Sequence, residues 1–473
     1  MKRGSSLALI ALLALGGLRW GWGRAAQARL NEAIAAARAR HEPVLPEDFP
    51  TSTLPEDRNA AITLQRAGAA LVEEANWNAM GRWKGGPLTP AELLRVEVIA
   101  ENNRLPLQLV RLARSQPDAD WGIGFPSSAH VQNFRGVARQ NALCSLEQWV
   151  ALRNHAHGND SESMEQVLDL LRQADALDQG CSTYLPHLAA MAFQSRTMAV
   201  LATITPGLRI AAGRDSPSAH GGAAQAAQIR EAIARLLDEH HLRDGAICMF
   251  DGTRVIAIEA VDATYHGGDV LIEYGAAEVW LVRPMFVLDA SRLVASFSLM
   301  RSAAAQPNWP AAERTLSRST SGWTDLDRYV HVLSSDFSFW RLRESMMHFP
   351  TLTDRRAAAI ALAIRLYCVD HGGRFPAQLS ELVPAYLPAV PADPMAADGR
   401  PFGYRPSAHP PVIYSVGRNA IDDGGTSLPD DITGGRRWEL PDAVYPLGPL
   451  PPKPPRTSGN SRRPPKRKTP PPG

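Results

Sequence analysis

Residues 414–432 read YSVGRNAIDDGGTSLPDDI, a short apolar strand followed by a loop crowded with glycines and carboxylates. The glycines let the backbone fold back, so that carboxylate and carbonyl oxygens can converge on a hard cation such as calcium. The candidate ligands are Asn419, Asp422, Asp423, Asp430 and Asp431. We therefore predict a calcium site in this loop. The alternative is a turn-rich hairpin whose aspartates are solvated.

A predicted amphipathic helix, residues 351–371, precedes this strand. Its apolar side consists of Ala358, Leu362, Ile364, Leu366, Tyr367 and Val369. Pro350 separates the helix from the preceding chain, and Thr353 is the expected cap with Asp354 in the first turn. The helix, the strand and the loop predict a small α+β module over residues 351–445.

The order of short motifs after this helix is diagnostic. The motifs are Asp370-His-Gly-Gly-Arg374-Phe375-Pro376, Leu382-Val383, Tyr386-Leu387-Pro388, Asp393-Pro394, Phe402-Gly-Tyr404 and Ile413-Tyr-Ser415-Val416-Gly417. In this order, residues 351–438 resemble the soluble domain of the major pseudopilin of type II secretion systems. The resemblance implies a small antiparallel sheet that a calcium-binding loop pins against the helix.

Within the loop, the resemblance extends to single positions. The matching residues are Ser415, Gly417, Gly424, Gly425, Asp431 and Ile432. Asn419 stands where the family has an aspartate, and Ala420 replaces a glycine. The resemblance therefore implies that Asp422 or Asp423 supplies the negative charge that is absent at Asn419.

The N-terminus has the pattern of an export signal. Lys2 and Arg3 precede an apolar run over residues 5–18. Extending the run to residue 23 adds two tryptophans at the depth of an aromatic belt. We predict an uncleaved, single-pass anchor in the inner membrane through residues 5–23, with the body on the periplasmic side. The alternative is secretion after cleavage at the small-x-small site that ends at Ala28.

Between the anchor and the module, the chain predicts a helical body. With 473 residues, 45% of them hydrophobic, the chain can form two or three folded units. Thr89, Pro90 and Glu92 predict a helix start with Thr89 as the cap. Residues 246–260 and 269–288 are enriched in β-branched and aromatic residues, which fits either a few strands or buried helices.

The expected fold class is mainly α, with an N-terminal membrane helix, an antiparallel helical body, the small α+β module and a disordered tail. The expected divisions are residues 1–41 (signal-anchor and membrane-proximal helix), 42–211 (helical body), 225–345 (second, mostly helical subunit), 351–445 (module) and 446–473 (tail).

The tail, residues 446–473, carries seven Lys or Arg residues, eleven prolines and no acid, while residues 1–445 carry 43 bases and 48 acids. Such a tail cannot bury a core, so we predict a disordered segment with polyproline character. In an exported protein its expected partners are anionic envelope polymers or lipid headgroups, and nucleic acid is not expected. A merely solubilising tail is the alternative.

The four cysteines add little to the assignment. They are Cys144, Cys181, Cys248 and Cys368, and they form no C-x-x-C motif. Export allows Cys144 to pair with Cys181. Four isolated buried thiols are the alternative.

The sequence offers little for catalysis. His240 and His241 are adjacent, not four residues apart, so one helical face cannot present both to a metal. Ser218 lies near His220, but no strand-turn-helix elbow surrounds it. We therefore predict a protein that is not an enzyme. The alternative is an exported hydrolase with an unrecognised site in residues 57–345.

The expected function is that of a membrane-anchored envelope protein of structural or interaction type, with a calcium-stabilised pseudopilin-like module and a link to protein secretion. The rest of the chain resembles large, uncharacterised bacterial envelope proteins in which such a module ends a helical ectodomain. The expected partners are the membrane, through residues 5–23, and other proteins of the cell envelope.

Overall fold

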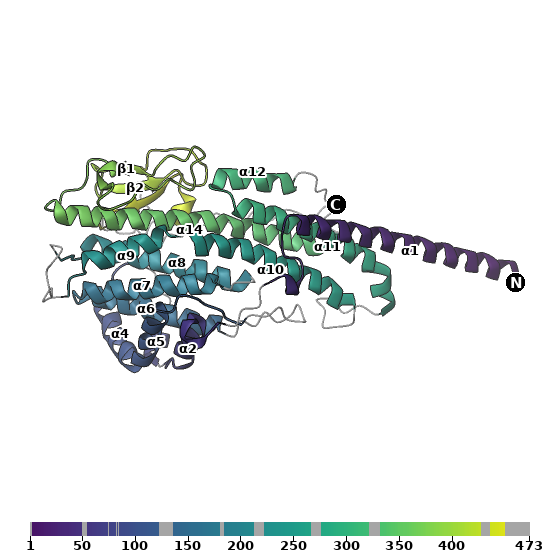
Figure 1. The fold of residues 1–473 in the computed structure, drawn as a ribbon, viewed down its shortest axis with the longest axis horizontal. Coiled ribbons are helices and arrows are strands. Elements are labelled where there is room, and N and C mark those ends of the chain that lie inside the picture. Colours follow the sequence, from purple (N-terminus) through teal and green to yellow (C-terminus); the bar gives the residue numbers. More distant parts are fainter. Residues whose placement is uncertain are drawn as a thin grey trace, which may run out of the picture.

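The computed structural model is mainly helical, with a small three-stranded antiparallel sheet near the C-terminus (Figure 1). This confirms the coarse fold class. The structure describes residues 2–49, 54–73, 75–81, 83, 85–122, 136–179, 184–211, 222–265, 276–320, 332–426 and 436–449. The expected disordered tail lies, from residue 450 on, outside the described residues.

The helices of the described residues are α1 (Lys2–Ala39), α2 (Ala60–Ala69), α3 (Ala75–Met80), α4 (Pro90–Asn102), α5 (Arg104–Arg114), α6 (Val137–Ala156), α7 (Asp160–Asp178), α8 (Tyr184–Ile204), α9 (Ala226–Leu237), α10 (His240–Tyr265), α11 (Ala276–Ala304), α12 (Trp309–Thr320) and α14 (Val332–Asp370). The strands are β1 (Gly403–Arg405), β2 (Val412–Ser415) and β3 (Ala443–Pro446).

The body is a layered helical bundle. Helices α6, α7 and α8 pack on one another, and α9 and α14 cover them (Figure 1). The predicted start of α4 is confirmed, because the Thr89 hydroxyl accepts from the backbone N–H of Glu92 while the Glu92 carboxylate accepts from Thr89. Such a capping box satisfies backbone donors that the first turn leaves free. One contiguous core joins these helices to α14, β2 and β3, so the sheet packs on the body.

Helix α14 begins much earlier than the sequence predicts. The helix expected from residue 351 begins at Val332, and Pro350 lies inside it. The prediction that Thr353 caps the helix is therefore wrong: its hydroxyl donates to the carbonyl of Phe349 at 2.8 Å, within the helix. Burial of Phe349 and Leu352 stabilises the helix through the proline, because tertiary packing outweighs one missing backbone hydrogen bond.

The sheet has the strand order β1-β2-β3 and is antiparallel throughout. Ile413 is the central position, with Tyr404 opposite it on β1 and Tyr445 opposite it on β3. Its side chain is fully buried in the core shared with α14. The sheet covers the outer side of α14 (Figure 1).

The two ambiguous segments are helices. Residues 246–260 lie in α10, and the described part of residues 269–288 lies in α11. Helix α11 passes through Pro284 and packs against both α10 and α1. Of the two sequence alternatives, the structure adopts helix in both segments, although Trp280 and Leu281 remain exposed.

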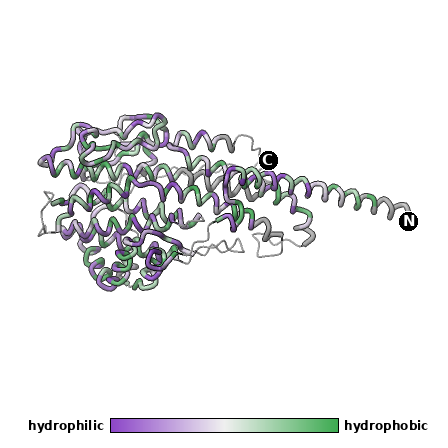
Figure 2. The backbone as a smooth tube through the Cα atoms, in the orientation of Figure 1, coloured by the Kyte–Doolittle hydropathy of each residue, from purple (hydrophilic) through white to green (hydrophobic). Residues whose placement is uncertain are grey.

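Helix α1 extends along α11 and then projects from the body (Figure 1). Its inner half shares a small apolar core with α11, formed by Ala26, Leu30, Ala37, Val44, Phe286, Val287, Ala290 and Val294. Figure 2 shows hydrophobic residues along the projecting part as well. Among the described residues, no helix has the length and apolar character needed to cross a membrane.

Candidate functional site

The Asp/Gly loop is held to the sheet by a buried aspartate. The carboxylate of Asp393 accepts from the Ser415 hydroxyl at 2.8 Å and from the backbone N–H of Val416 and Met395, each at 2.9 Å. Burial raises the pKa of Asp393, and these hydrogen bonds oppose the rise. The Asp-Pro and Ser-Val-Gly motifs of the sequence therefore meet in space and fix the start of the loop.

Three of the five predicted calcium ligands lie in the described part of the loop. Asn419 donates from Nδ2 to Oδ2 of Asp423 at 2.9 Å, and its Oδ1 accepts from the N–H of Ile421 at 3.0 Å. Oδ1 of Asp422 accepts from the N–H of Gly424 at 3.0 Å. These short-range bonds shape the turn. The other two predicted ligands, Asp430 and Asp431, lie outside the described residues.

The structure adds an acid that the sequence reasoning missed. Asp442 is buried just before β3, and its carboxylate accepts from the N–H groups of Gly425 at 2.7 Å and Asp423 at 3.3 Å. Burial raises its pKa, and the nearby charges of Asp423 and Asp422 raise it further. Its position between a proline and an apolar strand was the available signal, but it lies beyond the segment that carries the resemblance.

The described loop forms an acidic rim and is not a complete metal cage. Nη1 of Arg400 lies 3.6 Å from Oδ2 of Asp422, and Nη1 of Arg405 donates to the carbonyls of Gly424 and Gly425 at 3.3 and 3.2 Å. Within the described ranges, no three acidic, histidine or cysteine side chains are grouped as a metal site requires. Burial is the main cause of the raised pKa of Asp442, and the repulsion from Asp423 and Asp422 that adds to it is the part that a bound cation would relieve.

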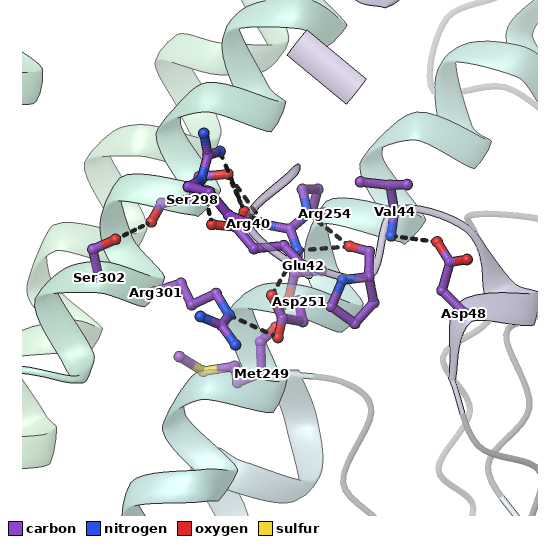
Figure 3. A network of polar contacts seen from close by, with 12 residues as sticks. Arg40, Glu42, Val44, Asp48, Met249, Asp251, Arg254, Ser298, Arg301 and Ser302 are labelled. Carbon is purple, nitrogen blue, oxygen red and sulfur yellow. Dashed lines mark hydrogen bonds and ion pairs between the residues drawn. The ribbon is translucent and has the colours of Figure 1, made fainter. Parts of the chain in front are cut away.

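A second polar centre fixes α1 to the body. Arg254 on α10 is fully buried, and its guanidinium donates to Glu42 at 2.9 Å and to Asp251 at 2.6 Å (Figure 3). It also donates to the carbonyl of Pro43 from two nitrogens, at 2.9 and 2.6 Å. Ser298 on α11 donates to Glu42. We call Glu42, Pro43, Asp251, Arg254 and Ser298 the Arg254 clamp.

The clamp balances its buried charges internally. Burial raises the pKa of Glu42, but hydrogen bonds from Arg40 and Ser298 and the charge of Arg254 leave it below its usual value. Burial raises the pKa of Asp251, and Arg254 and Arg301 oppose the rise. Two acids, Glu42 and Asp251, and three arginines, Arg40, Arg254 and Arg301, thus pair with one another at the point where α1 ends. The polar segment after α1 is thereby attached to both α10 and α11.

The projecting half of α1 exposes its large apolar side chains. Leu13 is 68% exposed and Leu18 is 72% exposed, and Ile10, Leu15 and Trp20 are similarly open. These residues belong to the segment 5–23 that the sequence assigns to a membrane. The free energy falls when an apolar surface covers side chains of this kind.

A polar groove lies between α4, α5, α6 and α7, with a volume of 490 Å³. Glu147 on α6 does not line this groove; it is fully buried, and neither carboxyl oxygen has a hydrogen-bond partner among the described residues. Burial raises its pKa well above the usual value. Burial also raises the pKa of Asp169 to about 6, although Arg111 donates to it at 2.7 Å. No sequence pattern marks Glu147 and Asp169 as a pair, because the two acids lie on different helices, α6 and α7.

The histidines and cysteines that the sequence singles out lie partly within the described residues. Nε2 of His241 lies 2.7 Å from the Gln179 side-chain nitrogen, and burial lowers the pKa of His241 to about 4. The thiol of Cys144 is free and buried, which agrees with the alternative of isolated buried thiols. Ser218, His220 and Cys181 themselves lie outside the described residues.

Comparisons of this chain with protein-family models, with characterised proteins and with solved structures found no match.

Proposed function

We propose that this chain is a membrane-anchored envelope protein of structural or interaction type, linked to protein secretion. The observation that carries the proposal is the state of α1: its inner half is held on α11 and by the Arg254 clamp, while its outer half presents exposed leucines and a tryptophan. An exposed apolar helix end that is held in place needs an apolar partner. We propose that this partner is the lipid bilayer.

The charges of α1 favour one orientation. Lys2 and Arg3 stand at its outer end, and the first acid of the helix is Glu32. Basic residues next to an apolar segment tend to stay on the cytoplasmic side of the inner membrane. In our proposal residues 5–23 enter the membrane and the helical body lies on the periplasmic side.

The C-terminal module is proposed to serve contacts with other envelope proteins, with its loop stabilised by calcium. The support is a small antiparallel sheet on a long helix, with Asp393 linking the motifs that resemble a pseudopilin. Asp422, Asp423 and Asp442 would supply the negative charge around the ion. Oxygen ligands with several negative charges suit calcium.

Calcium is expected to raise the melting temperature of the full chain by about 5 °C relative to chelator, because a ligand that binds only the folded state stabilises it. The double variant Asp422→Asn with Asp423→Asn keeps the side-chain shape, and it is expected to lose most of the increment. Asp398→Asn, which removes an exposed acid paired with Arg400, is the matched control. Equal melting curves of the wild-type protein in calcium and in chelator would remove the metal from the proposal.

The second candidate function is an exported hydrolase with its site in residues 57–345. The observation that favours it is a pair of buried carboxyls, Glu147 and Asp169, the second of which contacts Arg111 in the lining of the groove. Burial raises the pKa of both, and a carboxyl with a raised pKa can act as a general acid. Arg111 and Arg114 pair with Asp169, and this pairing is equally compatible with a structural role. The first candidate is therefore preferred.

The substitution Glu147→Gln tests, through the pH dependence of stability, whether the Glu147 carboxyl is protonated in the folded protein. The raised pKa means that the folded state keeps a proton that the unfolded state releases above about pH 4.5, so wild-type stability falls as pH rises toward the folded pKa. Glutamine removes this dependence, and we expect the variant to be more stable than wild type by about 1–3 kcal/mol at pH 8, with a smaller gap at pH 5. Urea unfolding at both values measures it.

Glu101→Gln, an exposed acid on the rim of the same groove, is the control and should change neither value much. If the difference in unfolding free energy between Glu147→Gln and wild type does not change with pH, the Glu147 carboxyl is not protonated in the folded protein. If wild type hydrolyses a chromogenic glycoside or ester and Glu147→Gln abolishes turnover without loss of folding, the hydrolase becomes the better assignment.

A further inference from the structure

Two exposed apolar residues of α11 lie beside the helix proposed as the anchor. Trp280 and Leu281, close to the start of α11, are each 56% exposed. Nε of Arg19 on α1 donates to the Trp280 carbonyl at 2.8 Å, and its guanidinium carbon lies 4.8 Å from the centre of the Trp280 ring. These contacts place the start of α11 beside the part of α1 at which α1 leaves the body.

The same level of α1 carries further tryptophan and arginine. Trp20 is 65% exposed and Trp22 is 43% exposed, and the guanidinium carbon of Arg24 lies 5.1 Å from the centre of the Trp20 ring. Together with Arg19 and Trp280, these residues form a collar around the base of the projecting helix. We call Arg19, Trp20, Trp22, Arg24, Trp280 and Leu281 the collar.

We propose that the collar is a second membrane contact, in which Trp280 and Leu281 enter the headgroup region of an anionic phospholipid surface beside α1. This inference rests on the proposed function, since it needs α1 in the bilayer. The proposal gives α11 a lipid-binding role at the membrane surface. Arg283 and Pro284 argue against a membrane span by this helix.

The chemistry of the collar selects lipid as the occupant. Tryptophan combines an apolar ring with a polar N–H, so it suits the interface between the apolar bilayer and water. Arginine pairs with phosphate through charge-assisted hydrogen bonds. Residues 2–31 of α1 contain five bases and no acid, so the charge of this surface complements anionic headgroups.

The test compares binding of the purified full chain to vesicles of phosphatidylcholine alone and to vesicles with 30% phosphatidylglycerol, measured by flotation. Trp280→Ala with Leu281→Ser is expected to weaken binding to the anionic vesicles about 10-fold. Arg24→Gln is expected to weaken binding to the anionic vesicles about 5-fold and to leave binding to neutral vesicles nearly unchanged. Leu94→Ser, which changes a leucine of similar exposure on α4, is the control.

Failure of this inference is distinguishable from failure of the proposed function. If the double variant binds like wild type while charged substitutions in the projecting part of α1 abolish binding, the collar contact is overturned and the anchor stands. If wild type binds no vesicle, both fall. If the double variant changes the oligomeric state and leaves vesicle binding unaltered, a second copy of the chain covers the collar, and the lipid assignment is wrong. Leu281→Ser alone, a solvent-facing change, repeats the comparison should the double variant misfold.

Discussion

Arg254→Ala is expected to lower the free energy of unfolding by about 3–5 kcal/mol. The substitution leaves Glu42 and Asp251 buried without the cation that both of them contact, and it removes both donors to the Pro43 carbonyl. The two acids then keep only the partly exposed Arg40 and Arg301 as cationic partners, and a buried charge that is only partly compensated costs more than a lost surface pair. Urea unfolding of the full chain measures the change. Limited proteolysis around residues 40–48 should also become faster, because the segment after α1 loses its attachment.

Two variants identify the source of this effect. Arg104→Ala breaks an exposed pair with Glu101, so it should cost about 0–1 kcal/mol. The triple variant Glu42→Gln, Asp251→Asn and Arg254→Met removes the charges together and should recover much of the stability. A cost for Arg254→Ala as small as that for Arg104→Ala would contradict the role assigned to the clamp.

Leu13→Glu with Leu18→Glu is expected to move the protein from vesicles into solution, with a loss of binding of about 1000-fold or more. Each carboxylate placed in the apolar part of a bilayer costs about 2–3 kcal/mol on insertion scales, and tenfold in affinity corresponds to about 1.4 kcal/mol. Both leucines are exposed in the structure, so the fold should be unaffected. Flotation of the purified full chain with vesicles measures the binding.

Leu94→Glu with Leu105→Glu is the matched control, because these leucines of α4 and α5 are similarly exposed but lie away from α1. This control should bind vesicles like wild type. Equal loss of binding in both double variants would attribute the effect to net charge and would refute a specific role for α1.

Local signals in the sequence predict much of the fold. The capping box at Thr89 and Glu92 is confirmed, because its hydrogen bonds form within four residues. The helix before the sheet is present, but its start is misplaced at Pro350 because a proline normally ends a helix. The structure overrides that preference through burial of Phe349 and Leu352, which lie on either side of Pro350. Such packing comes from other helices and leaves no local pattern.

Some polar clusters can also be predicted from short sequence patterns, and others cannot. The Asp393 motif and the Asp/Gly loop are visible as short patterns, and the structure joins Asp393 to Ser415, 22 residues away. The clamp is invisible in the sequence, because Glu42 and Arg254 are separated by 212 positions and each resembles an ordinary surface charge. Asp442 is an intermediate case, since it lies near the loop but beyond the motif.

Membrane anchoring through α1 is the central claim, and alkaline carbonate extraction of membranes from cells that produce the full chain tests it most directly. The chain, identified by its intact mass with residues 1–28 present, is predicted to remain in the membrane pellet. Recovery of that same uncleaved chain in the soluble fraction would contradict the account.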